Sequence, residues 1–382
     1  MNFIDRIIER FSPVKNLPEG VYHLQSTGDQ SKPFRLHLRL QKGGSGILIL
    51  NASTVMHLNP TAAEYAFHLI KGSDSLLAAN AISARYRINK SQALEDYANF
   101  VERILTLART NDLDPVSVLD FERVPPNSAD LTAPLRLDCA VTYRLPAGSD
   151  PVNAPLKRVD RELNTAEWQM IMDKAWAQGI PHIVFTGGEA TLRDDLPDLI
   201  SHAENNGQVT GLLTDGFKLA DSNYLDTLLK TGLDHLMIVI PTSGEPSWQA
   251  IQNVVAADIF LAVHLTVTPQ NVLNAHDLMD KLHRSGVEVL SLSLSDPALQ
   301  EQVARLRDYA VEINFRLVSD LPVPYSASHP LALEIAEDVE PLGAGKVWLY
   351  VEPDGDVLPA QGIADHILGN LLRDSWDKIY RP

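Results

Sequence analysis

The chain has 382 residues, of which 45% are hydrophobic and 21% charged, a composition typical of globular proteins and unlike that of disordered or collagen-like chains. Its length predicts two or three folding units. The net charge of -17 disfavours nucleic acid and anionic membrane surfaces as partners, because like charges repel. No apolar run approaches the roughly 18 residues that a membrane span requires. Cys139 is the only cysteine, which excludes an intramolecular disulfide, so we expect a cytoplasmic protein.

The first third of the chain predicts a small α+β domain over residues 20–110. Residues 1–19 precede it as an amphipathic helix (1–11) and a lead-in, with the apolar face of that helix expected to pack on its own protein. Strict alternation over 34–41 indicates a half-buried strand, and a glycine-rich turn leads into a second strand that ends near Leu50. Asn59 and Pro60 supply an N-cap and a first-turn proline for the first of three helices, which ends near Gly72. The other two helices are expected over 75–86 and 93–108.

A proline-rich linker is expected over 111–134, and a repeated strand-helix pattern follows over 135–325. The expected strands are 135–141, 182–185, 209–213, 235–240, 260–267 and 287–292, and the expected helices are 165–177, 194–204, 222–230, 246–256 and 275–284. Such units in succession require a parallel sheet with right-handed crossovers, either doubly wound or barrel-shaped. In both cases the binding face lies at the carboxyl ends of the strands. Residues 326–382 predict a terminal hairpin that turns at Pro353–Asp356, followed by a short helix.

The second strand of the repeated pattern runs into Thr186-Gly187-Gly188-Glu189, the third runs into Thr214-Asp215-Gly216, and the first is expected to end at Cys139 before a loop rich in Pro and Gly. Together these motifs resemble the radical S-adenosylmethionine family. The hairpin, residues 353–360, with Leu368-Gly369-Asn370 beyond it, is similar to the SPASM or twitch extension of peptide-modifying members. The segment 58–63 resembles the opening of a helix in the PqqD-like domain that binds leader peptides.

The resemblance implies a fold and a set of cofactor contacts. The expected fold is α/β: a partial (β/α)6 TIM-type barrel, an N-terminal winged-helix-like domain and a small C-terminal hairpin extension. The implied S-adenosylmethionine contacts are Gly187, Gly188, Glu189, Asp215, Ser243 and Thr268. Glu189 would accept a hydrogen bond from the methionyl amine. The alternative for Gly187, Gly188 and Glu189 is a tight turn from strand to helix. For Asp215, Ser243 and Thr268, which follow strands, the alternative is that they are polar loop residues in contact with solvent.

The cluster ligands of that family are not matched. Where the family has three cysteines, the resemblance aligns Cys139, Tyr143 and Pro146, and Ala360 stands where the hairpin usually has a cysteine. A four-iron cluster of this kind is held by three thiolates, for which a phenol and a proline ring are no substitute. We therefore expect no iron-sulfur cluster and no other metal, with Cys139 an inert buried thiol and the only remnant of the motif.

The first domain is where the resemblance would place a bound peptide. A peptide would add as an extra strand beside residues 34–41, near the helix over 93–108, with Arg35, His37 and Arg39 facing acidic residues of the peptide. The alternative is a solvated outward face of an amphipathic strand. Three further histidines, His182, His235 and His264, are expected to be structural.

Two functions from different classes follow. The first is a cluster-deficient pseudoenzyme that acts as a peptide-binding scaffold, or as the regulatory partner of a modification enzyme, in ribosomal peptide modification, with S-adenosylmethionine as a ligand it could retain. The second is a radical S-adenosylmethionine enzyme, or another barrel enzyme, that modifies a peptide substrate. Iron and sulfide analysis after anaerobic reconstitution separates the two.

Overall fold

The computed structural model describes residues 17–26, 33–110, 131–240, 245–257, 259–319, 321–336 and 341–381. The chain divides into two compact units, Met1–Ala129 and Asp130–Pro382. The helix expected over 1–11 and nearly all of the expected linker lie outside the described residues. The finer division into five segments stays a prediction. No helix among the described residues is long and apolar enough to cross a membrane.

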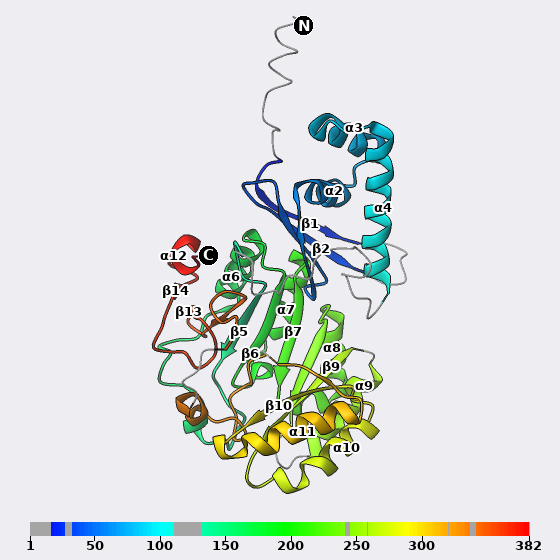
Figure 1. Ribbon diagram of the computed structural model, residues 1–382. Helices are drawn as coiled ribbons and strands as arrows, with labels where there is room; N and C mark the ends of the chain where they lie inside the picture. The colour runs from blue at the N-terminus through cyan, green and yellow to red at the C-terminus, as the bar shows by residue number, and fades with distance from the viewer. Residues whose placement is uncertain are drawn as a thin grey trace, which may run out of the picture. The chain divides into compact units, whose positions relative to one another are not determined.

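The N-terminal unit is a four-stranded antiparallel sheet with three helices packed on one face (Figure 1). Its elements are β1 (Gly20–Gln25), β2 (Arg35–Leu40), β3 (Gly46–Leu50), β4 (Thr54–Leu58), α2 (Pro60–Ile70), α3 (Ser75–Tyr86) and α4 (Lys90–Arg109). Leu36, Leu38 and Leu40 alternate along β2 into the core beneath the helices. Helix α2 begins where the sequence predicts, because the Asn59 side chain accepts a hydrogen bond from the Ala62 amide.

Strand β2 lies inside the sheet, which corrects the expected docking edge. Leu38 pairs with Tyr22 of β1 on one side and with Leu48 of β3 on the other. Strand β1, which the sequence analysis did not identify, takes the edge that β2 was expected to offer. His37 and Arg39 are also buried, at 1% and 2% exposure, so neither the peptide-facing nor the solvated interpretation of their side chains is right.

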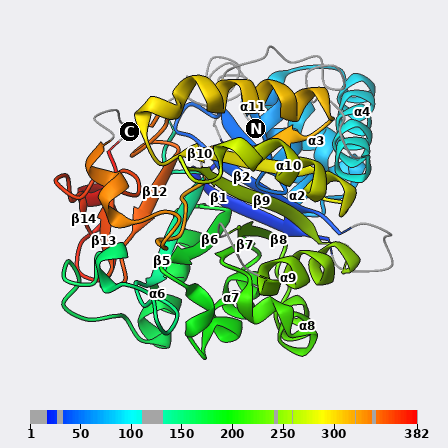
Figure 2. The same cartoon turned by 90° about the horizontal axis from the view of Figure 1, so that it is seen from below.

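The C-terminal unit contains one ten-stranded sheet (Figure 2). Seven parallel strands run in chain order from the centre to one edge: β5 (Arg136–Thr142), β6 (His182–Gly187), β7 (Val209–Thr214), β8 (His235–Val239), β9 (Phe260–Val267), β10 (Val289–Leu294) and β11 (Arg316–Leu317). On the other side of β5 lie parallel β12 (Trp348–Val351) and antiparallel β13 (Asp356–Leu358) and β14 (Gly369–Asn370). The hairpin that the sequence predicts therefore extends the main sheet.

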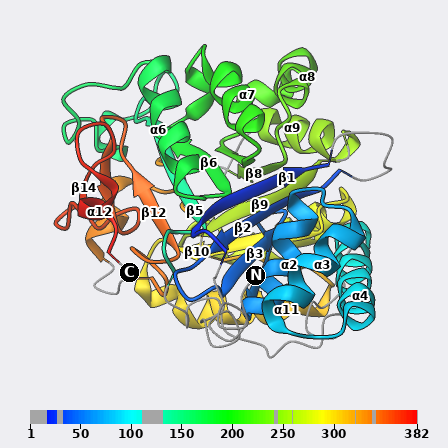
Figure 3. The same ribbon diagram turned by 90° about the horizontal axis from the view of Figure 1, so that it is seen from above.

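Helices connect the parallel strands and cover the outer face of the sheet (Figures 2 and 3). They are α6 (Thr165–Ala177), α7 (Leu196–Asn206), α8 (Ser222–Lys230), α9 (Glu245–Ala256), α10 (Ala275–Arg284) and α11 (Gln300–Glu312), with α12 (Trp376–Ile379) near the C-terminus. Helix α6 carries a complete capping box between Asn164 and Glu167, as its sequence predicts. The large core between helices and sheet holds Cys139 and Val141 from β5.

The inner face of the sheet has its own packing. Val184, Met237 and Val289 form a second core there with Val323, which belongs to the segment that follows β11. One cavity is lined by residues of β5, β12 and β10. Because four strands separate β10 from β5 in the sheet, the sheet must curve to bring them together. It does not close among the described residues, since β11 and β14 are its edges. The description as a partial barrel stays a prediction, as does the winged-helix likeness of the first unit.

Candidate functional site

The Gly187-Gly188-Glu189 segment lies at the carboxyl end of β6, packed against the chain that leaves β5. The Gly188 amide donates to the Thr142 carbonyl at 2.8 Å, and the Glu189 amide donates to the Arg144 carbonyl at 2.9 Å. A Cβ atom on Gly187 would stand 2.0 Å from the Thr142 oxygen, and one on Gly188 would stand 2.4 Å from the Arg144 oxygen. Both glycines are thus required by a close approach of two backbones.

Glu189 joins the loops after β6 and β7. Its side chain is 4% exposed and accepts four hydrogen bonds. The Thr191 amide and hydroxyl donate to Oε1 at 3.0 and 2.6 Å, the Thr214 hydroxyl donates to Oε1 at 2.8 Å, and the Asp215 amide donates to Oε2 at 2.8 Å. A carboxylate has about four acceptor sites, so the protein itself uses most of this group's hydrogen-bonding capacity.

Asp215 belongs to the same hydrogen-bonded unit. Its carboxylate accepts a hydrogen bond from the Phe217 amide at 2.8 Å, and its carbonyl accepts one from the Ser247 hydroxyl at 2.9 Å. Burial raises the pKa of the Asp215 carboxyl well above its usual range, and the charge of Glu189 raises it further. Glu189 and Asp215 are therefore two neighbouring acids, and each accepts a hydrogen bond from a backbone amide of the loop after β7.

The remaining residues assigned from the resemblance do not join this unit in the described chain. Thr268 follows β9, and its amide and hydroxyl are both hydrogen-bonded to Asn271 in a local turn. Ser243 lies outside the described residues. The structure thus brings together four of the six assigned residues, Gly187, Gly188, Glu189 and Asp215, and what binds there stays a prediction.

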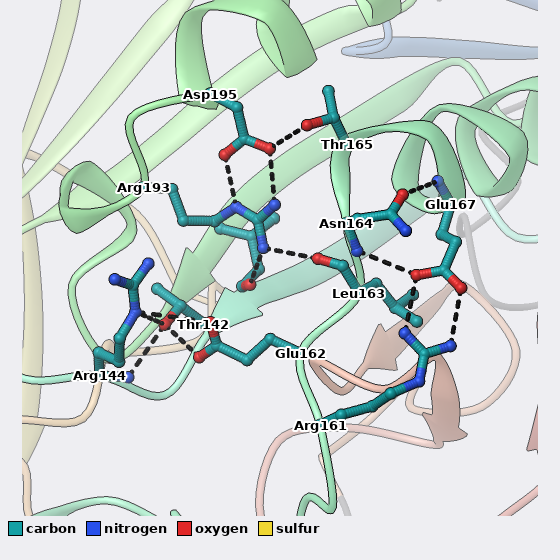
Figure 4. Close-up of polar contacts among 11 residues, drawn as sticks. Thr142, Arg144, Arg161, Glu162, Leu163, Asn164, Thr165, Glu167, Arg193 and Asp195 are labelled. Carbon is teal, nitrogen blue, oxygen red and sulfur yellow. Dashed lines mark hydrogen bonds and ion pairs between the residues drawn. The ribbon is translucent and has the colours of Figure 1, made fainter.

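An open groove of about 500 Å³ lies between the loops after β5 and β6. Figure 4 shows the polar contacts of Arg144, Glu162, Arg193 and Asp195, which line it. Arg193 is its buried element: its guanidinium pairs with both oxygens of Asp195 at 2.8 and 2.7 Å and donates to the Val141 and Leu163 carbonyls. Arg144 is half-exposed and contacts Thr142 and Glu162. Arg193 therefore connects the loop after β5 with the loop after β6. Arg144, in contrast, is exposed at the surface of the groove.

A buried polar cluster surrounds Arg158 on the inner face of the sheet. The guanidinium donates to Glu352 at 2.5 Å and to Glu334 at 3.0 Å. It also reaches the hydroxyls of Tyr143 and Tyr325 at 3.4 and 3.3 Å. Burial raises the pKa of both carboxyl groups, and Arg158 opposes that shift. The sequence analysis missed this cluster, because Arg158 lies in an irregular loop and its partners are 176 and 194 residues further along the chain.

The donor set does not fit a thiolate-bound iron cluster. Cys139 lies in the middle of β5 and not at its end, because the strand runs on to Thr142. Its side chain is fully buried in the core beneath the helices, and burial raises the pKa of the thiol. The chain from Tyr143 to Asn164, between β5 and α6, contains no cysteine. The described residues also hold no cluster of three or more His, Cys, Asp or Glu side chains placed to bind a metal ion.

Three of the residues that the resemblance assigns to S-adenosylmethionine have partners within the chain. The Gly187 carbonyl accepts a hydrogen bond from the Tyr325 amide at 2.8 Å, and Tyr325 is 1% exposed. The carbonyl of Arg144 lies against Gly188, and Glu189 is hydrogen-bonded as described above. Contact of these residues with the cofactor stays a prediction.

The three strand histidines have structural partners, as the sequence predicts. His182 and His235 face each other with their Nε2 atoms 2.7 Å apart, and burial lowers the pKa of both rings. His264 is hydrogen-bonded to the Ser291 hydroxyl at 3.0 Å and to that of Ser293 at 3.0 Å.

The fold and this site define an α/β protein with a large parallel sheet whose loops at the carboxyl strand ends are tied together by Glu189. The same fold is found in SuiB of Streptococcus suis. The structure of SuiB bound to S-adenosylmethionine superposes with a TM-score of 0.61 and 18% identity, covering 91% of this chain and 87% of SuiB. SuiB bound to its precursor peptide SuiA gives a TM-score of 0.60 and 16% identity, covering 96% of this chain and 88% of SuiB.

The curated proteins that are similar in sequence include two named PqqA peptide cyclase. That of Methylobacterium sp. (strain 4-46) is 27% identical over an alignment of 262 positions, which covers 60% of this chain and 67% of the relative. That of Granulibacter bethesdensis is 36% identical over 107 residues, 28% of each chain. No family model matches this chain.

Proposed function

We propose that this chain is a cluster-deficient, peptide-binding scaffold or regulatory partner in the modification of ribosomally made peptides, active in the cytoplasm. The similarity to two peptide cyclases and the fold shared with the SuiB–SuiA complex support a peptide partner. One observation supports the absence of radical chemistry: the single cysteine of the chain, Cys139, is buried in β5, in the core between the sheet and its helices. Fewer than three thiolates cannot hold a four-iron cluster of the radical type.

The peptide is expected at an edge of the N-terminal sheet, whose edge strands in the described part of the chain are β1 and β4. The Ser26 amide donates to the Phe34 carbonyl, so alternate residues of β1 point their N–H groups toward β2 and Val21 points its N–H outward. The same alternation, counted from the Asn51–Arg35 hydrogen bond, turns the Val55 N–H of β4 outward. Either row of outward groups could pair with an added strand.

Two proline variants locate the docking edge. Val21→Pro and Val55→Pro each remove one outward N–H and leave the native ladder intact. Fluorescence anisotropy with labelled copies of small peptides encoded beside the gene is the readout. We expect one variant to bind at least about tenfold more weakly, since a blocked strand edge loses several hydrogen bonds, while the other serves as its matched control. Wild-type affinity in both variants would reject docking at an edge, and no binding of any such peptide by the wild type would reject the peptide-binding role.

The alternative, a radical enzyme that modifies a peptide, is favoured by the peptide cyclase similarity over 262 residues. Anaerobic reconstitution of the wild type and of Cys139→Ala separates the two functions. We expect iron and sulfide far below four per chain and no 5′-deoxyadenosine from either protein. A brown, stoichiometric cluster in the wild type, with S-adenosylmethionine cleavage under reducing conditions, would establish the enzyme.

S-adenosylmethionine binding is a separate part of the proposal. The resemblance implies it, and the SuiB structure contains it, but here Gly187, Gly188 and Glu189 bond within the chain. Isothermal titration calorimetry with S-adenosylhomocysteine measures it directly. We expect weak affinity, because the Gly187 carbonyl already accepts a hydrogen bond from Tyr325 and the Glu189 carboxylate already accepts four within the chain.

A further inference from the structure

A second cavity, of about 290 Å³, lies on the inner side of the C-terminal sheet. Its walls come from the carboxyl end of β10, the start of β12, the segment after β11 and the chain after β13. Most of the wall is apolar, with Leu294, Leu321, Val323, Leu333, Trp348 and Ile363 contributing. The volume falls at the lower end of the usual range for ligand sites, so an occupant must be small.

The charges around this cavity leave one carboxylate in excess. Asp138 is paired with Arg136, whose guanidinium donates to both of its carboxylate oxygens. Arg158, in contrast, is shared by Glu334 and Glu352 at 3.0 and 2.5 Å. One guanidinium cannot balance two ionised carboxylates, and a buried charge without a counter-charge is costly.

Glu334 is the member of this pair that lines the cavity. Its side chain is only 9% exposed, and its Oε2 atom takes the Arg158 contact. Its Oε1 atom is buried and has no hydrogen-bond partner in the described part of the chain. Nδ1 of His329, which also lines the cavity, is likewise buried without a partner. Two residues that line the cavity thus each carry a buried polar atom without a partner, and a ligand that supplies hydrogen bonds would satisfy both atoms.

We propose that this cavity binds a primary ammonium group carried on a short apolar body, with Glu334 as its counter-ion and His329 as a second hydrogen-bond acceptor. An ammonium group donates three hydrogen bonds and brings the missing positive charge. An anion would face Glu334 and Asp138 across the same space, and a neutral alcohol would leave the excess charge unbalanced. The apolar walls fit the carbon chain of such an amine.

Two properties of the groups agree with this occupant. Burial lowers the pKa of His329 to about 4, so the ring is neutral at pH 7 and one nitrogen can accept a hydrogen bond. Burial raises the pKa of Glu334, so a bound cation is expected to lower it again. The inference does not depend on the proposed function, because it concerns a different part of the chain and needs no leader peptide.

The test uses the full chain at pH 7 and three probes of equal length: pentylamine, pentanol and pentanoate. We expect pentylamine alone to raise the Tm in a saturable way, by about 3–5 °C at ten times its Kd. The variant Glu334→Gln keeps the shape of the side chain and should bind pentylamine about tenfold more weakly or not at all. Glu312→Gln, at the exposed end of α11, is the matched control and should bind as the wild type does.

Ala360→Leu provides a variant that leaves the charges in place. Ala360 lines the cavity and is 5% exposed, so a leucine there fills space and should also abolish binding. Equal stabilisation by pentanol, or undiminished pentylamine binding in both cavity variants, would overturn the proposal, as would the absence of any effect of pentylamine on the wild type.

The amine could belong to a free metabolite or to a lysine side chain. The tripeptide acetyl-Gly-Lys-Gly-amide distinguishes these sources, with its norleucine analogue as control. If the lysine peptide competes with pentylamine and the norleucine peptide does not, the cavity accepts a peptide side chain. If neither peptide competes while pentylamine binds, the cavity is assigned to free amines.

Discussion

Glu189 and Asp215 lie at the carboxyl ends of neighbouring strands, and both carboxyl groups accept hydrogen bonds from the protein itself. Glu189 receives donors from Thr191, Thr214 and Asp215, which lie in two different loops. The raised pKa of Asp215 follows from its burial beside that charge. An acid placed in this way prefers to keep its proton, so its contribution to stability depends on pH.

Asp215→Asn tests this contribution. The folded-state pKa of Asp215 lies above its unfolded value, so as pH rises from about 4 toward 7 the unfolded chain loses a proton that the folded chain retains. The wild-type protein therefore loses unfolding free energy as the pH rises. The asparagine variant can still accept a hydrogen bond from the Phe217 amide and should not show that loss. We expect urea unfolding to show a gain for the variant at pH 7 relative to pH 4 of about 1 kcal/mol or more. Asp226→Asn, exposed on α8, should show no such gain; parallel pH profiles for wild type and Asp215→Asn would contradict the assignment.

Arg158→Met tests the buried cluster. The substitution leaves Glu334 and Glu352, at 9% and 2% side-chain exposure, without a counter-charge, and should cost about 3–5 kcal/mol of unfolding free energy. The loss should be smaller at pH 5 than at pH 8, because carboxyls with raised pKa values are protonated more readily at the lower pH. Chemical denaturation at the two pH values is the measurement.

The matched control is Arg305→Met, whose ion pair with Glu301 has side chains that are 71% and 77% exposed and should cost less than about 1 kcal/mol. The double variant Arg158→Met/Glu352→Gln should recover part of the loss, since it removes one of the stranded charges. A cost below about 1 kcal/mol for Arg158→Met alone would show that the cluster does not behave as a buried ion pair.

At this scale the sequence predicts which residues follow which strands but not what they contact. Gly187, Gly188, Glu189 and Asp215 meet as expected, because the carboxyl ends of adjacent parallel strands lie side by side. Their mutual hydrogen bonds depend on side-chain directions that no spacing encodes. Arg158 and Glu352 are still further from prediction, since their contact joins two irregular segments across the inner face of the sheet.

Among the elements, the junction of β6 with the chain after β5 depends most on a single residue type. Gly188 does not have a positive φ, so its requirement is purely steric: the Arg144 carbonyl oxygen occupies the place of a Cβ. Gly188→Ala must therefore push two backbones apart, and overpacking of this kind costs about 1–3 kcal/mol. A fall in Tm of several degrees is the expected readout.

Gly43→Ala is the matched control, because a Cβ at Gly43 has no neighbouring atom within 4 Å. An unchanged Tm for Gly188→Ala would mean that the loop after β5 can withdraw from β6. The same movement would uncover Gly187 and Gly188, so in that case S-adenosylmethionine binding should be measured again in the variant.

Helices are the elements whose bounds the sequence predicts best. The bounds of α3, α6, α8 and α10 match the expected ranges, and α3, α6 and α8 each begin with a side-chain N-cap hydrogen bond. Three strands, β1, β4 and β11, were not predicted. Strand β1 lacks alternation, with five half-buried residues in a row, and β4 and β11 are short. Helix α11 was not predicted, although Val303, Leu306 and Ala310 carry a helical spacing.

For the whole molecule, the order of strands could be predicted from the chain and the curvature could not. Successive strand-helix units imply a parallel sheet in chain order, which the structure has from β5 to β11. The burial of Val323 and Tyr325 against the inner face arises from an irregular segment, for which the sequence offers no period to detect.

Cys139 reports on the folding of the entire C-terminal unit. Its side chain has no exposed surface, it packs in the core shared by the parallel strands and their helices, and burial raises the pKa of its thiol. A thiol reagent can therefore react only when that core opens. With a typical unfolding free energy of about 5 kcal/mol or more, labelling by a disulfide reagent in native buffer should be slowed at least about 10³-fold relative to the urea-unfolded chain. Pentylamine, if it binds as inferred, should slow the reaction further, and Glu334→Gln should remove that protection. Rapid labelling of the native protein would place the thiol within reach of solvent and of metal, and the argument against an iron cluster would have to be made again from the remaining ligands alone.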